Sequence, residues 1–241
     1  MWVLALDTTT RDGSVALVRD GDVVVERPSD AAWTHAERLP ADLRAVLDEA
    51  GVPLTAVDLV AVATGPGAFT GLRIGLAAAQ GLALALDRPA AGVPTLAALA
   101  WDVLTRHPEH RAAGAWLDAT RGEVYAAAFE AGSPRAAWPL VPLCPPLSAP
   151  PAAVLEAWHG VVPPGLAVAL ASPHPGTADL TAAGLLAVAP AAYLAGLVGR
   201  IGAIAHAAGG SGPAAALSPE YVRRPDVEIA RDRGRGASPA C

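Results

Sequence analysis

A glycine-rich stretch of eleven residues constrains the fold of this chain more than any other feature. It runs Gly65-Pro-Gly-Ala-Phe-Thr-Gly-Leu-Arg-Ile-Gly75 and lies between an apolar run, 59–63, and a long segment rich in Ala, Leu and Gly. This pattern predicts a strand, a turn and a helix. Gly65 and Gly67 permit a positive φ or the close approach of another backbone, and Thr70 can cap the helix. In a doubly wound α/β sheet, a loop of this kind is where an anion binds.

A phosphate-binding role for this turn lacks the residue that the chemistry requires. The phosphate-loop pattern places a lysine just inside the helix, but Leu72 follows Gly71 here. All seventeen basic residues of the chain are arginines. A bare Gly-Pro-Gly turn is more often structural than ligand-binding, so the turn alone does not indicate a nucleotide-binding enzyme.

An internal repeat indicates how the rest of the chain is arranged. Segment 6–18 aligns with segment 117–129 when one residue is skipped, and Asp, Thr, Arg and Gly match at the turn. Both segments have the pattern of a strand, a turn and a second strand. Between them, apolar residues at helical spacing predict a helix over His35–Ala50 that Gly51 ends. Strands and helices alternate as in an α/β layer fold, and the repeat predicts that it is built from a duplicated unit.

The glycine-rich stretch resembles the signature of the TsaB (YeaZ) family, in which Ser is usual at the position of Ala68. The resemblance extends to segments 4–10, 35–39, 118–125 and 219–226. It implies a duplicated actin/Hsp70/sugar-kinase-like (ribonuclease H-like) α/β fold with a reduced second lobe. We expect an N-terminal lobe over residues 1–110, a shorter C-terminal lobe over 111–229 and a disordered tail over 230–241.

Composition excludes several classes of function. The net charge of -6 does not suit a protein that grips a nucleic-acid backbone by itself, because such binding needs clustered basic residues. Cys144 and Cys241 form neither a metal pattern nor a disulfide framework. The chain begins with a core-like strand rather than a signal peptide, and polar residues interrupt its two most apolar segments. We therefore expect a cytoplasmic protein that does not enter a membrane.

The implied fold would place the first hairpin and the glycine turn at a phosphate-facing cleft. In nucleotide-hydrolysing relatives of that fold, the equivalent hairpin holds a hydrated Mg²⁺ and a γ-phosphate. The alternative is that Asp7 only caps its own turn, and Asp118 is likewise expected in a tight turn rather than as an acid or base. Without a lysine or a His-x-x-x-His pair, we expect no catalytic residue and no metal ligand. The vestigial turn would comprise Asp7, Thr8, Thr9, Gly65 and Gly67.

A stripe of small residues predicts a docking face on the helix after the turn. Gly71, Gly75 and Ala79 fall four residues apart, so a second helix could approach closely. Packing inside this chain is the alternative. The apolar face of the helix over 35–50 favours a partner, since two helices side by side can complete a four-helix bundle. The expected interface comprises Leu39, Leu43, Val46, Leu47, Gly71, Leu72, Gly75, Ala78, Ala79 and Leu82.

The family resemblance implies a non-catalytic scaffold or activator subunit. Its catalytic, TsaD-like paralogue would transfer a threonylcarbamoyl group to N6 of the adenosine at position 37, in tRNAs reading codons that begin with A. A small TsaE-like ATPase would join the assembly, and tRNA would be bound only through it. ATP and a metal are implied for these partners, and this chain is expected to bind no cofactor tightly. The alternatives are an ATPase or glycoprotease-like hydrolase that uses Asp7 and the turn 65–67, or a stand-alone homodimeric binding protein.

Overall fold

The chain folds around two five-stranded sheets. The computed structural model describes residues 1–10, 12–30, 32–132, 138–170 and 177–223. The first sheet has the order β3-β2-β1-β4-β5, and the second has the order β10-β9-β6-β7-β8. The first consists of β1 (Trp2–Asp7), β2 (Ser14–Arg19), β3 (Asp22–Pro28), β4 (Leu59–Gly65) and β5 (Ala90–Pro94). The second consists of β6 (Ala112–Asp118), β7 (Val124–Ala131), β8 (Leu140–Ala149), β9 (Ala167–Leu170) and β10 (Leu186–Val188).

The two sheets repeat one topology. In the first, β1 pairs antiparallel with β2 and parallel with β4, and β4 pairs parallel with β5. In the second, β6 pairs antiparallel with β7 and parallel with β9, and β9 pairs parallel with β10. The two segments that align in sequence are therefore the equivalent hairpins β1–β2 and β6–β7. The predicted duplicated α/β fold is confirmed.

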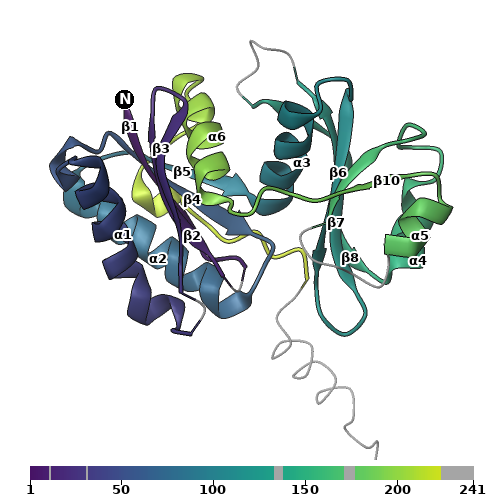
Figure 1. The fold of residues 1–241 in the computed structure, drawn as a ribbon, viewed down its shortest axis with the longest axis horizontal. Helices are drawn as coiled ribbons and strands as arrows, with labels where there is room; N and C mark the ends of the chain where they lie inside the picture. Colours follow the sequence, from purple (N-terminus) through teal and green to yellow (C-terminus); the bar gives the residue numbers. More distant parts are fainter. Residues whose placement is uncertain (11, 31, 133–137, 171–176, 224–241) are drawn as a thin grey trace, which may run out of the picture.

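Helices and sheets alternate in layers across the molecule (Figure 1). On the outer face of the first sheet lie α1 (His35–Ala50) and α2 (Phe69–Leu86). Between the sheets lie α3 (Thr95–Arg106) and α6 (Ala195–Ala207), and beyond the second sheet lie α4 (Pro151–Trp158) and α5 (Thr177–Ala182). The short 3-10 turns 54–56 and 214–216 complete the described elements.

Alternating side chains on the strands supply two separate cores for the first sheet. Leu4 and Leu6 of β1 face α1 and α2, whereas Val3 and Ala5 face α3 and α6. Helix α6 lies very close to the sheet because it carries glycine at the contact. A Cβ on its Gly199 would lie 2.6 Å from Val18 and 3.0 Å from Ala5. This close packing ties α6, which comes late in the chain, to the first sheet.

The helix boundaries follow local capping chemistry. Thr34 and Glu37 form a capping box at the start of α1, and Gly51 ends the helix with a left-handed φ of 65°. The capping box was not predicted from the sequence, whereas the end of the helix at Gly51 was. Thr70 does not cap α2 as expected. The N-cap is Ala68, so Thr70 lies inside the first turn of the helix.

The second lobe departs most from the sequence expectations. Strand β8 occupies the proline-rich segment before residue 151, and three of its ten residues are prolines. They are tolerated because β8 is an edge strand, where one side makes no ladder hydrogen bonds. The lobe boundary expected between residues 110 and 111 falls in the loop before β6, but α6 returns to the first sheet from beyond it. The expected tail, 230–241, lies outside the described residues.

Candidate functional site

The carboxylate of Asp7, at the end of β1, bonds to its own turn. The residue is 1% exposed. Its Oδ1 accepts hydrogen bonds from the backbone N–H of Thr9 at 2.9 Å and from the Thr9 hydroxyl at 2.6 Å, and its Oδ2 accepts one from the Thr10 hydroxyl at 3.2 Å. Burial raises the pKa of Asp7 above its usual value, and the bonds from Thr9 oppose that shift. This is the turn-capping geometry that the sequence left open as the alternative.

The glycine turn packs directly against the Asp7 turn. A Cβ on Gly67 would lie 2.5 Å from the carbonyl oxygen of Thr9, which accepts a hydrogen bond from the N–H of Ala68 at 2.8 Å. Gly65 adopts a φ of 100°, which favours glycine. The two turns that the family resemblance groups together are thus in direct contact. However, backbone fills the space between them, and the N–H at the helix start is already bonded.

A segment from the second half of the chain covers Asp7. Residues 190–194, just before α6, close a cavity of about 90 Å³ with Asp7, Thr10 and Leu99 in its lining. Ligand pockets for drug-sized molecules are typically about 300 to 1,000 Å³. The cavity is therefore too small for a nucleotide. Within the described residues, no three His, Cys, Asp or Glu side chains gather as a metal site.

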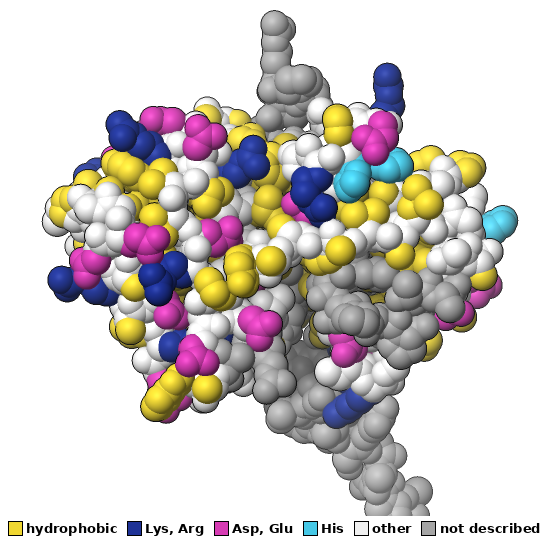
Figure 2. All heavy atoms as spheres, in the orientation of Figure 1, with side chains coloured by type: hydrophobic (Ala, Val, Ile, Leu, Met, Phe, Trp, Pro, Cys, Tyr) yellow, Lys and Arg dark blue, Asp and Glu magenta, His cyan; other side chains and the backbone are white. Residues whose placement is uncertain are grey.

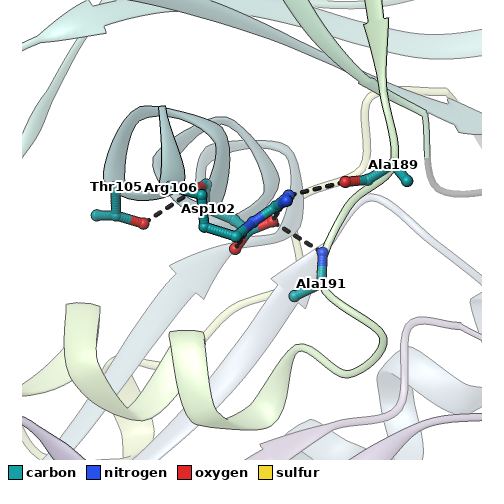
Figure 3. Close-up of polar contacts among 5 residues, drawn as sticks. All are labelled: Asp102, Thr105, Arg106, Ala189 and Ala191. Atoms are coloured by element: carbon teal, nitrogen blue, oxygen red, sulfur yellow. Dashed lines mark hydrogen bonds and ion pairs between the residues drawn. The ribbon is translucent and has the colours of Figure 1, made fainter. Parts of the chain in front are cut away.

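Two charged side chains of α3 hold this covering segment in place (Figure 3). Asp102, which is 3% exposed, accepts a hydrogen bond from the N–H of Ala191 at 2.8 Å. Arg106 pairs with Asp102 at 2.5 Å and donates to the carbonyl of Ala189 at 2.8 Å. This clamp was not predicted from the sequence, because the groups that Asp102 and Arg106 contact on the segment are backbone groups.

Two side chains of α1 bind the loop that follows Asp7. The Nε2 atom of His35 lies 3.1 Å from the carbonyl oxygen of Thr10, and Arg38 donates to the carbonyl of Asp12 at 2.9 Å. Arg38 also lies 2.9 Å from Nδ1 of His35. Burial, and then the charge of Arg38, lower the pKa of His35. These residues were missed as site residues, since the helix pattern over 35–50 only marked them as helical.

The second hairpin places its aspartate differently from the first. Asp118 is exposed, and its carboxylate accepts a hydrogen bond from the N–H of Thr120 at 2.7 Å. Residues 120–122 all have a positive φ, so the turn is tight. Arg223 donates to the carbonyl of Ala119 at 3.2 Å and lies 3.5 Å from Glu123. The geometry is that of the expected tight turn, and it ties the segment before residue 224 to the second lobe.

Most of the expected interface residues are not on the surface, which corrects their assignment as a docking face. On α2, Gly71 and Gly75 face the Asp7 turn. A Cβ at Gly71 would collide with the carbonyl of Thr8, and one at Gly75 with its hydroxyl. The reason is that the small residues let α2 approach its own sheet. The buried members are Leu39, Leu43, Val46, Leu47, Gly71, Leu72, Gly75 and Ala79.

The opposite face of α2 is open and nearly all apolar. Ala77, Gly81 and Ala85 are exposed, and the predicted residues Ala78 and Leu82 are partly exposed beside them. A Cβ added at Gly81 would meet no atom within 4 Å. By length and composition alone α2 could cross a membrane, but here its other face packs on the first sheet. The surface that could receive a partner is therefore this exposed face, which we call the outer face of α2.

Taken together, the fold defines a class. Two sheets of the same topology, each opened by a strand-Asp-turn-strand hairpin, form an α/β protein of the actin-like fold. The structure of YeaZ from Pseudomonas aeruginosa superposes with a TM-score of 0.72 and 31% identity, over 91% of this chain and 100% of that chain. The chain therefore belongs to the TsaB/YeaZ family.

Sequence comparisons agree with this assignment. The chain is 38% identical to the tRNA threonylcarbamoyladenosine biosynthesis protein TsaB of Escherichia coli over 130 residues. These residues cover 54% of this chain and 55% of that protein. It is 40% identical over 104 residues to the tRNA N6-adenosine threonylcarbamoyltransferase of Thermus thermophilus, 37% of this chain and 32% of that protein. The family model of TsaD, described as tRNA N6-adenosine threonylcarbamoyltransferase, matches residues 22–136. The E. coli match thus spans about half of the curated relative, and the transferase match about a third.

Proposed function

We propose that this chain is a non-catalytic scaffold or activator subunit in the biosynthesis of threonylcarbamoyladenosine in tRNA. Its TsaD-like paralogue would transfer the threonylcarbamoyl group to N6 of the adenosine at position 37, and a small TsaE-like ATPase would join them in the cytoplasm. Membership of the TsaB/YeaZ family supports the pathway. The observation that carries the subunit role is the outer face of α2, which is apolar and open, whereas the cavity above Asp7 is small and covered.

The closed cleft favours a scaffold over an ATPase or hydrolase. Asp7 is bonded to its own turn, and the covering segment leaves about 90 Å³ above it. A carboxylate that is to hold a hydrated cation and a phosphate needs free oxygen lone pairs and room for both. Accordingly, ATP and metal would be supplied by the partner subunits, and this chain would bind no cofactor tightly.

Gly81 is the residue that favours a helical partner on the outer face of α2. A glycine in a helix interior costs about 1 kcal/mol relative to alanine. Packing against the residues that the structure describes gives no reason for this glycine, since a Cβ there would meet none of their atoms within 4 Å. A second helix that crosses at Gly81 does give a reason, because small residues let two helices approach to the near end of the roughly 8 to 10 Å range. The partner would be the TsaD-like paralogue, and a second copy of this chain could occupy the same face in its absence.

The charge distribution indicates that tRNA is bound through the assembly. Figure 2 shows the arginines of this view interspersed with Asp and Glu side chains rather than gathered into one patch. With a net charge of -6, the chain alone should bind tRNA weakly and with a strong dependence on salt. Tight binding of tRNA by the isolated chain at physiological salt would contradict this part of the proposal.

The docking proposal is tested by matched charge insertions. Ala77→Arg places a charge on the outer face of α2, and Ala157→Arg makes the same change at an exposed position of α4. Both variants should keep the parental melting temperature. Only Ala77→Arg should weaken binding to the TsaD-like subunit, measured by size exclusion and titration calorimetry, by roughly five- to 150-fold, which corresponds to the about 1 to 3 kcal/mol of a disturbed contact. If both variants bind like the parent, the partner docks elsewhere.

The non-catalytic role is tested on the isolated chain. Neither ATP hydrolysis nor tRNA modification should be detectable, whereas addition of the TsaD-like and TsaE-like subunits should produce modified tRNA. Turnover by the isolated chain that disappears in Asp7→Ala would overturn the scaffold proposal and restore the hydrolase alternative.

A further inference from the structure

The open edge of the first sheet lies along β5. In a parallel pair, alternate residues of a strand direct both backbone groups to the neighbouring strand. The N–H of Val60 bonds to the carbonyl of Pro89, and Val60 is paired in register with Ala90, so Ala91 and Val93 also face β4. Ala90 and Gly92 therefore face away from the sheet. The outward N–H and carbonyl groups of these residues form the edge to which another strand could be added.

Of these two outward residues, the first is paired with another segment that the structure describes, and the second is not. Ala90 exchanges two hydrogen bonds with Gly212, at 2.8 and 3.0 Å. An antiparallel continuation of this pairing would place Gly210 opposite Gly92. The N–H of Gly210 instead bonds to the carbonyl of Ala205, because the chain turns back at that point. Among the residues that the structure describes, no bond is recorded to the outward N–H or carbonyl of Gly92.

A groove opens where the pairing stops. Its volume is about 440 Å³, and small side chains and backbone line it. One wall is β5 with Gly92, and the other is the segment 216–220. That second wall is fixed, since the N–H of Glu220 donates to the carbonyl of Thr64 at 2.7 Å. The groove therefore leaves room for a stretch of main chain beside Gly92.

The groove also contains a carboxylate that is not paired with any residue that the structure describes. Glu220 lines it and is partly buried, and within the described ranges no hydrogen bond or ion pair to its carboxylate is recorded. Burial raises the pKa of Glu220. A partly buried carboxylate is stabilised by a cation that brings hydrogen-bond donors, as a guanidinium or ammonium group does.

We propose that this groove binds an extended segment of a partner protein, which adds a short strand to β5 at Gly92 and places a basic side chain against Glu220. Main-chain hydrogen bonds to a sheet edge would hold the segment, and the carboxylate would select the basic residue. The proposal does not depend on the outer face of α2, because none of the residues that define that face lines the groove.

The experiment uses the full chain labelled with ¹⁵N and two synthetic peptides. The first is acetyl-Ala-Val-Arg-Val-Ala-amide, and the second replaces Arg by the neutral isostere citrulline. Saturation with the first should slow amide hydrogen exchange at Gly92 by about tenfold or more, while Ala90 and Ala91, which are already bonded, should change little. The Arg peptide should bind at least about fivefold more tightly than the citrulline peptide.

Two variants test whether the carboxylate of Glu220 causes the preference for the Arg peptide. Glu220→Gln should remove the preference for the Arg peptide, and Glu109→Gln, an exposed carboxylate remote from the groove, should leave it unchanged. Absence of any change at Gly92 up to millimolar peptide would overturn the proposal, as would equal binding of the two peptides by the parent chain. A chain truncated after Arg223 supplies the last comparison. If truncation by itself speeds exchange at Gly92, residues 224–241 are the occupant, and a partner segment is excluded.

Discussion

The two faces of α2 carry similar residues and lie in opposite environments. Gly75 and Gly81 belong to the same helix, but a Cβ at Gly75 would collide with the hydroxyl of Thr8, whereas one at Gly81 would meet nothing within 4 Å. On the inner face, glycine lets the helix approach the Asp7 turn. On the outer face, no described residue of this chain gives a reason for glycine. Small residues at helical spacing therefore indicate close packing without revealing which neighbour is packed.

The largest expected difference between the faces comes from leucine at each glycine. Gly75→Leu should destabilise the isolated chain by about 3 kcal/mol, because overpacking at a rigid turn leaves no room for relaxation. Gly81→Leu should stabilise it by up to about 1 kcal/mol, since leucine favours the helix more than glycine does. Urea denaturation of both variants without any partner measures this. Equal stability of the two would mean that the inner face is not packed as described.

The hydroxyl of Thr8 provides the next test of the inner face. It donates to the carbonyl of Gly71 at 2.8 Å in a fully buried position. Thr8→Val keeps the shape and removes the donor, so we expect a loss of about 1 kcal/mol in the free energy of unfolding. Thr70→Val, at an exposed position in the first turn of α2, is the matched control and should change stability by less than about 0.5 kcal/mol. A similar loss in both variants would show that replacing threonine by valine lowers stability at either position, independently of the buried bond.

The pH dependence of stability tests the turn beneath the inner face. Burial raises the pKa of Asp7, so between the unfolded and folded pKa values the folded chain holds a proton that the unfolded chain has lost. Stability from this group is therefore present below the unfolded pKa and decreases as pH rises through the folded pKa. One proton contributes at most about 1.4 kcal/mol per pH unit.

Asp7→Asn should remove that slope, and the difference from the parent separates Asp7 from other buried carboxyl groups such as Glu26, whose pKa is also raised by burial. Urea denaturation at a series of pH values from 4 to 7 gives the two curves. Parallel curves for parent and variant would show that Asp7 titrates as in the unfolded chain.

The features that could be predicted from the sequence are those that depend on residues close together in the chain or on a repeated segment. The repeat located both hairpins, and Gly51 and the apolar spacing located the end and the inner face of α1. Strand β8 was missed because prolines are normally excluded from strands. They are tolerated in β8 because it lies at the edge of the sheet, which the sequence does not reveal. The closure of the cleft was missed as well. It depends on Asp102 and Arg106 meeting backbone at 189–191, which is contact between distant segments with no local pattern.

The smallest expected effect separates the two faces most directly. Gly81→Ala adds a single methyl group where a Cβ would meet no atom, so it should stabilise the isolated chain by about 0.5 to 1 kcal/mol through helix propensity alone. If a partner helix crosses at this glycine, the same methyl group must intrude on the contact, and binding to the TsaD-like subunit should weaken although the chain itself is more stable. Thermal melts of the chain measure the change in stability, and calorimetric titration with the subunit measures the change in affinity. A gain in stability together with a loss of affinity is expected only where Gly81 contacts a neighbour outside the chain. A gain in stability with unchanged binding would place the partner away from Gly81, and a loss of stability would show that the outer face of α2 is packed within this chain.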